Sequence, residues 1–275
     1  MTLPTTFPEL LRESEVPVDR AALVIARDAY PQLDIDEQLA RLDSLAAPLA
    51  PRIARCHTVQ SQAAALGTYV YDELGFRGDE ETYYDPRNSY LNDVIERRTG
   101  IPISLAVVLI AIGTRAGLAV EGIGFPGHFL VRLGGSTGIY LDPFFRARTL
   151  SREALERLLR RALGDAAHMA PEHLAPVSTR AIAARMLTNL KAVYESRKEH
   201  ARALVVCDRL VDLSGSPEMR RDRGAHAIAL GAMGAGIEDY ERYLLDRPDA
   251  GDAAKIRARL DELRSANQRA TRHAN

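Results

Sequence analysis

One apolar run near the middle of the chain limits the possible folds more than any other feature. The run "IPISLAVVLIAIG" spans residues 101–113, and its proline stands where it favours the first turn of a helix. The run is too short to cross a bilayer core of about 30 Å. We therefore predict a buried core helix from Pro102 to about Ala116, ended by Gly117, around which a globular domain must close.

The pattern changes from helical to β-like directly after this helix. Three short runs of strand type follow, "LAVEGIGF", "HFLVRLGG" and "IYLDPF", with the turn signals "PG" and "GGSTG" between them. They predict an antiparallel meander. The first 75 residues have the apolar spacing of helices, so the predicted fold class is α+β, a helix packed on an antiparallel sheet with helical N-terminal additions.

The C-terminal part of the chain is predicted to be helical throughout. A stretch rich in histidine and proline, "AAHMAPEHLAPVS", suggests a boundary between domains at residues 1–165 and 178–275. The segments "ALVVCDRLVDLSGSP" and "GIEDYERYLLDRPDA" match about 33 residues apart, a period typical of tetratricopeptide repeats. An ordinary pair of helical hairpins is the alternative. Two repeats are too few to stand alone, so we expect this region to lean on the first domain.

Composition excludes several classes of function. The formal net charge is −1, so neither a nucleic-acid nor a membrane partner is expected. The two cysteines, Cys56 and Cys207, lack metal-ligand spacing and are predicted to be small buried hydrophobes, so we expect no metal and no cofactor. The N-terminus lacks the features of a signal peptide, and with so few cysteines this indicates the reducing cytoplasm.

Three residues of the central segment form a candidate catalytic set. Ser104 falls in the first turn of the predicted helix, where free backbone N–H groups favour an anion. His128 begins the second β-run and Asp142 ends the third, and a hairpin that joins these runs could place both side by side. Nucleophile, base and orienting acid would then follow one another in chain order.

The same segment resembles a known family. "DPRNSYLNDVIERRTGIPISLAVVLIAIGTRAGLAVEGIGFPGHFLVRL" is similar to the transglutaminase-like core of the bacterial SirB-type proteins, and the tail is similar to their tetratricopeptide-like part; the resemblance spans roughly residues 20 to 260. It implies a papain-like fold. Active members of the superfamily carry cysteine, histidine and aspartate at the positions of Ser104, His128 and Asp142, so the histidine and aspartate match but the nucleophile does not. SirB-type proteins typically carry serine, threonine or alanine at this position.

The departure at Ser104 decides between the predicted functions. A histidine can hold a cysteine as thiolate, whereas a serine needs strong base catalysis and an oxyanion hole. We therefore expect a catalytically degenerate protein that binds a protein or peptide. The alternative is a serine-dependent acyl transferase or peptidase that uses Ser104, His128 and Asp142. A third possibility is that the tail alone carries the function.

Other residues near the predicted helix could belong to a binding cleft. Asn88 and Asn92 could donate hydrogen bonds into a peptide pocket, or they could cap the preceding helix. Tyr83, Tyr84 and Tyr90 could line the cleft, or they could pack in the core and at its rim.

Overall fold

The computed structural model describes residues 4–13 and 15–274, and within them two compact units meet at residues 186 and 187. The first unit combines helices with a sheet, and the second is helical, which confirms the predicted α+β class with an all-α C-terminal region. In the described part of the chain, none of the helices combines the length and the apolar character that a membrane crossing requires.

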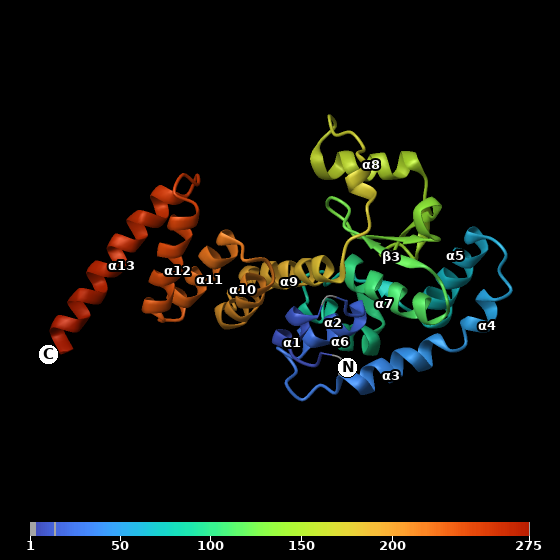
Figure 1. Cartoon of the computed structure of the whole chain (residues 1–275), viewed down its shortest axis with the longest axis horizontal. Coiled ribbons are helices and arrows are strands. Elements are labelled where there is room, and N and C mark those ends of the chain that lie inside the picture. The colour runs from blue at the N-terminus through green and yellow to red at the C-terminus, as the bar shows by residue number, and fades with distance from the viewer. Residues whose placement is uncertain (1–3, 14, 275) are drawn as a thin grey trace. The chain divides into compact units, whose positions relative to one another are not determined.

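Short helices make up most of the first unit (Figure 1). They are α1 (Phe7–Arg12), α2 (Val18–Ala26), α3 (Ile35–Ala46), α4 (Ala50–Ile53), α5 (Val59–Gly67), α6 (Leu91–Arg97), α7 (Pro102–Arg115) and α8 (Arg152–Leu163), with a π-helical segment at Thr68–Glu73 and 3-10 turns at Pro86–Asn88, Gly135–Thr137 and Pro171–Leu174. The apolar spacing of residues 34–53 suggests one helix, but Pro48 ends α3 because it lacks an N–H and restricts the residue before it.

Helix α7 is the centre of the first unit. Eleven of its fourteen residues are buried, and it contacts α2, α3 and α6 as well as the strands β3 (Val120–Ile123) and β4 (Leu130–Leu133). Figure 1 shows the strands on one side of α7 and the helices α2 and α6 on the other. A helix that is apolar all round is stable only inside a protein, so the predicted core helix is confirmed.

The main sheet has four antiparallel strands in chain order, β3, β4, β5 (Ile139–Asp142) and β6 (Arg148–Leu150). The three predicted strands are present, and β6 is an addition whose three residues carry no recognisable alternation. Ile123 and Leu130 form a cluster with Leu155 and Leu159 of α8, while Val120 lies next to Gly113 of α7. The sheet therefore lies between α7 and α8.

A second, smaller strand pair joins two segments that are distant along the chain. β1 (Arg77–Gly78) pairs in parallel with β2 (Thr99–Gly100), which directly precedes α7. The sequence around β1 predicts only an ordered loop. Two-residue strands have no periodicity to detect, and this pairing depends on where α7 places β2.

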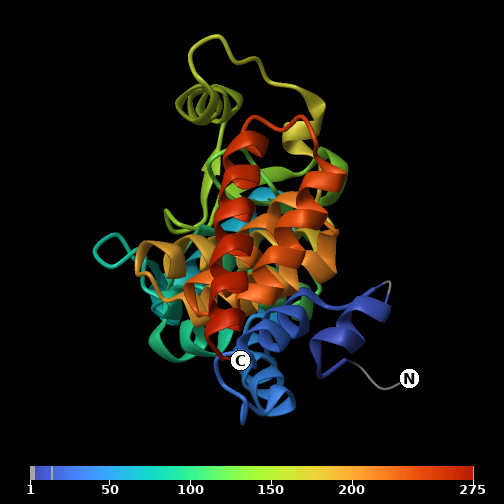
Figure 2. The same cartoon turned by 90° about the vertical axis from the view of Figure 1, so that its left-hand side faces the viewer.

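The second unit contains α10 (His200–Ser214), α11 (Pro217–Ala229), α12 (Met233–Asp246) and α13 (Ala253–Ala274), and α9 (Thr179–Ser196) crosses into it from the first unit. Each helix from α10 onward packs on the next, and Figure 2 shows α12 and α13 side by side in orange and red. Pro217 begins α11 and Pro248 lies between α12 and α13, so both prolines stand at the breaks that the repeat predicts.

Gly113 allows α7 to approach the sheet. A Cβ atom on this residue would lie 2.7 Å from Cγ2 of Val120. Alanine normally stabilises a helix by about 1 kcal/mol relative to glycine, but we expect Gly113→Ala to lower the free energy of unfolding by about 1–3 kcal/mol because of this overlap. Urea unfolding followed by circular dichroism measures the change.

The matched experiment removes the obstructing atoms. In a protein that already carries Val120→Ala, Gly113→Ala should lower the free energy of unfolding much less than it does in the wild type. The reason is that Val120→Ala removes the methyl group with which the new Cβ would overlap. If the two costs were equal, the close approach of α7 to β3 would not explain the glycine.

Candidate functional site

The structure brings two of the three candidate catalytic residues into direct contact. His128 lies just before β4 and Asp142 is the last residue of β5, and these strands are hydrogen-bonded neighbours. The distance between Nε2 of His128 and Oδ1 of Asp142 is 2.8 Å. The Asp142 side chain is fully buried, while 14% of the His128 side chain is exposed.

Asp142 organises the loop that follows β5. Its carboxylate accepts hydrogen bonds from the backbone N–H of Phe144 at 3.1 Å and from the Arg148 guanidinium at 3.3 Å. Burial by itself raises the pKa of this carboxyl, but the hydrogen bond and charge of His128, the charge of Arg148 and the Phe144 N–H outweigh burial and lower the pKa below its ordinary value. Asp142 is therefore held as a buried carboxylate.

Ser104 occupies the third position of α7, and its side chain is used within the fold. Its hydroxyl accepts a hydrogen bond from the backbone N–H of Ile101 at 3.0 Å and donates to the carbonyl oxygen of Asn88 at 2.6 Å. The residue has no exposed surface. A hydroxyl has one proton to donate, and among the described residues the hydrogen bonds of Ser104 reach Asn88 and Ile101 but not His128.

Asn88 is equally bound into the fold. Its side-chain amide donates to Asp79 at 2.9 Å and to the carbonyl oxygen of Thr82 at 2.8 Å, and its oxygen accepts from Arg97 at 3.0 Å. The side-chain amide of Asn88 thus ties the loop before α6 to the end of α6, while its backbone carbonyl oxygen, which accepts from Ser104, ties this loop to the start of α7. Asn92 lies in α6, and its Oδ1 is buried and meets no hydrogen-bond donor among the described residues.

A polar cleft lies beside this network. It has a volume of about 760 Å³, and both Asp79 and Arg97 line it together with the neighbouring Arg77 and Glu81. Gly78 lies in the same wall, where a Cβ would come within 2.7 Å of the Phe144 ring. The close approach of β1 to Phe144 therefore connects the cleft with the loop that Asp142 holds.

Aromatic side chains form a row next to that loop. Tyr84 contacts Tyr83, Tyr83 contacts Phe144, and Phe144 contacts Phe145, with ring centroids 5.3, 6.1 and 5.3 Å apart. The Arg148 guanidinium lies over the Phe145 ring at 4.5 Å. Tyr84 is 63% exposed, Phe145 42% and Tyr83 39%. This set, Tyr83, Tyr84, Phe144, Phe145 and Arg148, is called the aromatic row below.

Sequence reasoning found only part of the aromatic row. Tyr83 and Tyr84 were candidates, but Tyr90 is buried and packs edge-to-face on Tyr30 at 5.6 Å, so it belongs to the core. Phe144, Phe145 and Arg148 were not singled out. Two consecutive phenylalanines directly after the "DP" turn signal were the available signal.

Cys207 is buried as predicted, whereas Cys56 is half-exposed, so the prediction of a buried residue is wrong there. Burial raises the pKa of Cys207 to about 12, which keeps it a thiol. Cys56 lies near α5, with its sulfur close to the carbonyl oxygens of Arg52 and Ser61. Within the described residues, no group of histidine, cysteine or carboxylate side chains has an arrangement that could hold a metal ion.

Comparison with known proteins places this geometry in a family. Residues 36–188 match the model of the transglutaminase-like superfamily, and residues 190–261 match a tetratricopeptide repeat model. A UPF0162 protein of Xylella fastidiosa (strain Temecula1) is 38% identical over 266 residues, which cover 95% of this chain and 94% of that protein. The chain belongs to the UPF0162 proteins of the transglutaminase-like superfamily.

More distant relatives of this UPF0162 chain share the core. The UPF0162 protein of Vibrio cholerae is 33% identical over 201 residues, 72% of this chain and 74% of that protein. F-box only protein 21 of Homo sapiens is 33% identical over 142 residues, which are 48% of this chain but 22% of that protein. No solved structure matches the chain significantly. The transglutaminase-like and tetratricopeptide predictions are confirmed.

The hydrogen bond between His128 and Asp142 predicts a specific pH dependence. Because the pKa of Asp142 is lowered in the folded state, the carboxylate stabilises the protein above its ordinary pKa of about 3.9, and this contribution is lost as the pH falls through the lowered value. We expect His128→Ala to lower the free energy of unfolding at pH 7 by about 1–3 kcal/mol, since a buried carboxylate loses a partner. The penalty should shrink toward pH 3.

Urea unfolding of wild type and variant at a series of pH values between about 7 and 3 measures the difference. His57→Ala is the matched control, because His57 is exposed. A penalty for His128→Ala that did not change with pH would contradict the assigned role of the Asp142 carboxylate.

Proposed function

We propose that the protein is a catalytically degenerate, SirB-type member of the transglutaminase-like superfamily that binds a protein or peptide partner. One observation carries the proposal. The hydroxyl at the nucleophile position, Ser104, is fully buried and donates its proton to the Asn88 carbonyl oxygen. A nucleophile must reach its substrate and must pass its proton to a base. Ser104 is buried away from substrate, and its hydroxyl donates to a carbonyl oxygen, which is not a base.

His128 and Asp142 then have a structural task in the proposal. Their hydrogen bond joins the start of β4 to the end of β5, and Asp142 fixes the loop that carries Phe144. Asn88 acts indirectly, since its amide holds the loop along the polar cleft. Asn92 stays a proposed binding residue because its Oδ1 meets no donor in the described part of the chain, and direct contact requires that this buried oxygen become accessible.

The binding surface that we propose is the aromatic row beside the polar cleft. Aromatic side chains with one exposed face supply large contact area and are enriched at the energetic centres of protein interfaces. The cleft adds charged and hydroxyl groups that can bind backbone or polar side chains of a peptide. We propose a cytoplasmic protein that needs no cofactor or metal and binds neither nucleic acid nor membrane; the near-neutral charge and the two cysteines support this.

One specific observation favours the alternative, a serine-dependent acyl transferase or peptidase. Nε2 of His128 and Oδ1 of Asp142 are 2.8 Å apart, the arrangement that orients a catalytic histidine. The alternative requires Ser104 to leave the Asn88 carbonyl oxygen and turn toward His128. The two functions therefore differ in whether this side chain becomes reactive.

Labelling with phosphonylating and alkylating probes separates the two functions. After incubation with a fluorophosphonate and with iodoacetamide, we expect peptide mass spectrometry to find wild-type Ser104 unmodified. Ser104→Cys should be alkylated slowly at neutral pH, because the site is buried. Ser104→Ala should lower the free energy of unfolding by about 1–3 kcal/mol, since the Ile101 N–H and the Asn88 carbonyl oxygen both lose a partner.

Peptide mapping also provides the internal control, because both cysteines are present in every variant: half-exposed Cys56 reports the reactivity of an accessible thiol, and Cys207 that of a buried one. Stoichiometric phosphonylation of wild-type Ser104 that disappeared in His128→Ala would overturn the proposal and favour the serine enzyme.

Peptides selected by phage display on the full chain test the binding surface. We expect Phe145→Ser to weaken the peptides that bind the first unit at least fivefold in calorimetry, because an exposed aromatic side chain is removed from the row. Leu163→Ser is the matched control, since Leu163 is 58% exposed on α8 and lies outside the row. Equal losses in both variants would contradict a specific role of the aromatic row.

A further inference from the structure

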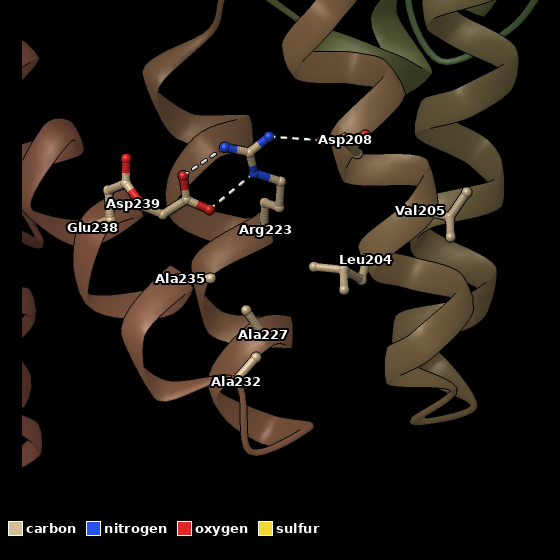
Figure 3. A pocket seen from close by; sticks show the side chains of 9 residues that line it. All are labelled: Leu204, Val205, Asp208, Arg223, Ala227, Ala232, Ala235, Glu238 and Asp239. Carbon is tan, nitrogen blue, oxygen red and sulfur yellow. Dashed lines mark hydrogen bonds and ion pairs between the residues drawn. The ribbon is translucent and has the colours of Figure 1, made fainter. Parts of the chain in front are cut away.

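The tetratricopeptide unit contains a cavity of its own between α10, α11 and α12 (Figure 3). Its volume is about 340 Å³, and most of its wall is apolar. Leu204 and Val205 come from α10, Ala227 from α11, and Ala232 and Ala235 from the start of α12 and the residue before it. Figure 3 shows Leu204 pointing toward the alanines.

The cavity exists because small residues line it. Helices α11 and α12 cross closely at Gly224 and Gly236, and a Cβ on Gly224 would lie 2.9 Å from that of Asp239. Helix α10 packs on α11, and the alanines are too short to fill the space left toward α12. Ala232 and Ala235 are exposed, so the cavity is open to solvent, and its volume exceeds the value of about 300 Å³ at which ligand pockets begin.

The charged rim of the cavity is acidic. Arg223 donates to both carboxylate oxygens of Asp239 at 2.9 and 2.7 Å and to Asp208 at 2.7 Å (Figure 3). Its guanidinium is thereby committed to two carboxylates. Glu238 adds a third carboxylate and is exposed. The rim therefore carries one positive and three negative charges. Of the three carboxylates, those of Asp208 and Glu238 are accessible to solvent.

We propose that this cavity binds a short segment of a protein partner that presents an aliphatic side chain between cationic residues. The methyl-lined wall takes the aliphatic side chain, and Asp208 and Glu238 attract lysine or arginine at the rim. An acidic segment would meet like charges, because Arg223 is already paired on both sides. This inference rests on the proposed binding function, and it specifies the kind of partner segment that binds in this cavity.

Defined peptides and methyl labels locate the binding event on the full chain. The probe is an acetylated, amidated peptide with a central Lys-Leu-Lys flanked by glycines, titrated into protein that carries ¹³C-methyl alanine. We expect the methyl signals of Ala227, Ala232 and Ala235 to shift with a common dissociation constant. Peptides with Glu-Leu-Glu or Lys-Ser-Lys at the centre should bind at least tenfold more weakly, and added salt should weaken the probe.

Two variants test the cavity directly. Glu238→Lys reverses a rim charge, and Ala235→Arg places a long cation in the space while it keeps a good helix former at an exposed position. Each should weaken the probe at least fivefold. Asp261→Lys is the matched control, because it makes the same charge change at an exposed position of α13 outside the cavity. It should leave the affinity unchanged, with all circular dichroism spectra alike.

The outcomes separate this inference from the proposed function. Absence of shifts at the three alanines, or equal effects of Glu238→Lys and Asp261→Lys, overturns the assignment of the cavity. If the probe shifts only alanines outside the cavity, such as Ala147, this assignment is overturned while the binding function stands. If neither the probe nor any selected peptide binds the full chain, both are overturned.

Discussion

The burial of α7 on all sides is the constraint on which the first unit depends. Strands cover one side of this helix and helices the other, so its N-terminal backbone N–H groups lie in the interior and need partners. The Ser104 hydroxyl accepts a hydrogen bond from the Ile101 N–H and donates one to the carbonyl oxygen of Asn88. The residue at the nucleophile position therefore satisfies a requirement of folding. Any catalytic use of its hydroxyl would compete with that requirement.

The contact between His128 and Asp142 follows from the sheet and does not depend on Ser104. Two neighbouring antiparallel strands place the residue before β4 near the end of β5, and the buried carboxylate then gathers His128, Arg148 and the Phe144 N–H around it. A pair of this kind can orient a histidine for catalysis or can fix a loop. In the function proposed above, the serine at the start of α7 leaves this pair with the structural task.

The two units present surfaces of different chemistry, and each surface arises from its own local composition. In the first unit, consecutive phenylalanines after Asp142 and a pair of tyrosines before α6 form an exposed aromatic row with Arg148. In the second unit, glycines and alanines let helices approach closely and leave an aliphatic cavity with an acidic rim. The two proposed binding surfaces therefore suit segments of different chemistry.

The sequence by itself determined the core helix, three of the strands and the helical repeat, because apolar periodicity, proline and glycine encode such elements locally. It also indicated that His128 and Asp142 would meet, since a hairpin between their two runs brings them together. Tertiary structure alone decided the pairing of β1 with β2, the fourth strand, and the partner of Ser104, a carbonyl sixteen residues away. Tertiary structure also brought together the side chains of the aromatic row and those that line the cavity. The β1–β2 pairing, the Ser104 hydrogen bond and the aromatic row join segments that are distant along the chain, which only the packing around α7 brings together. Strand β6 follows β5 closely but is too short to show a pattern, and the cavity depends on how the consecutive helices α10, α11 and α12 pack.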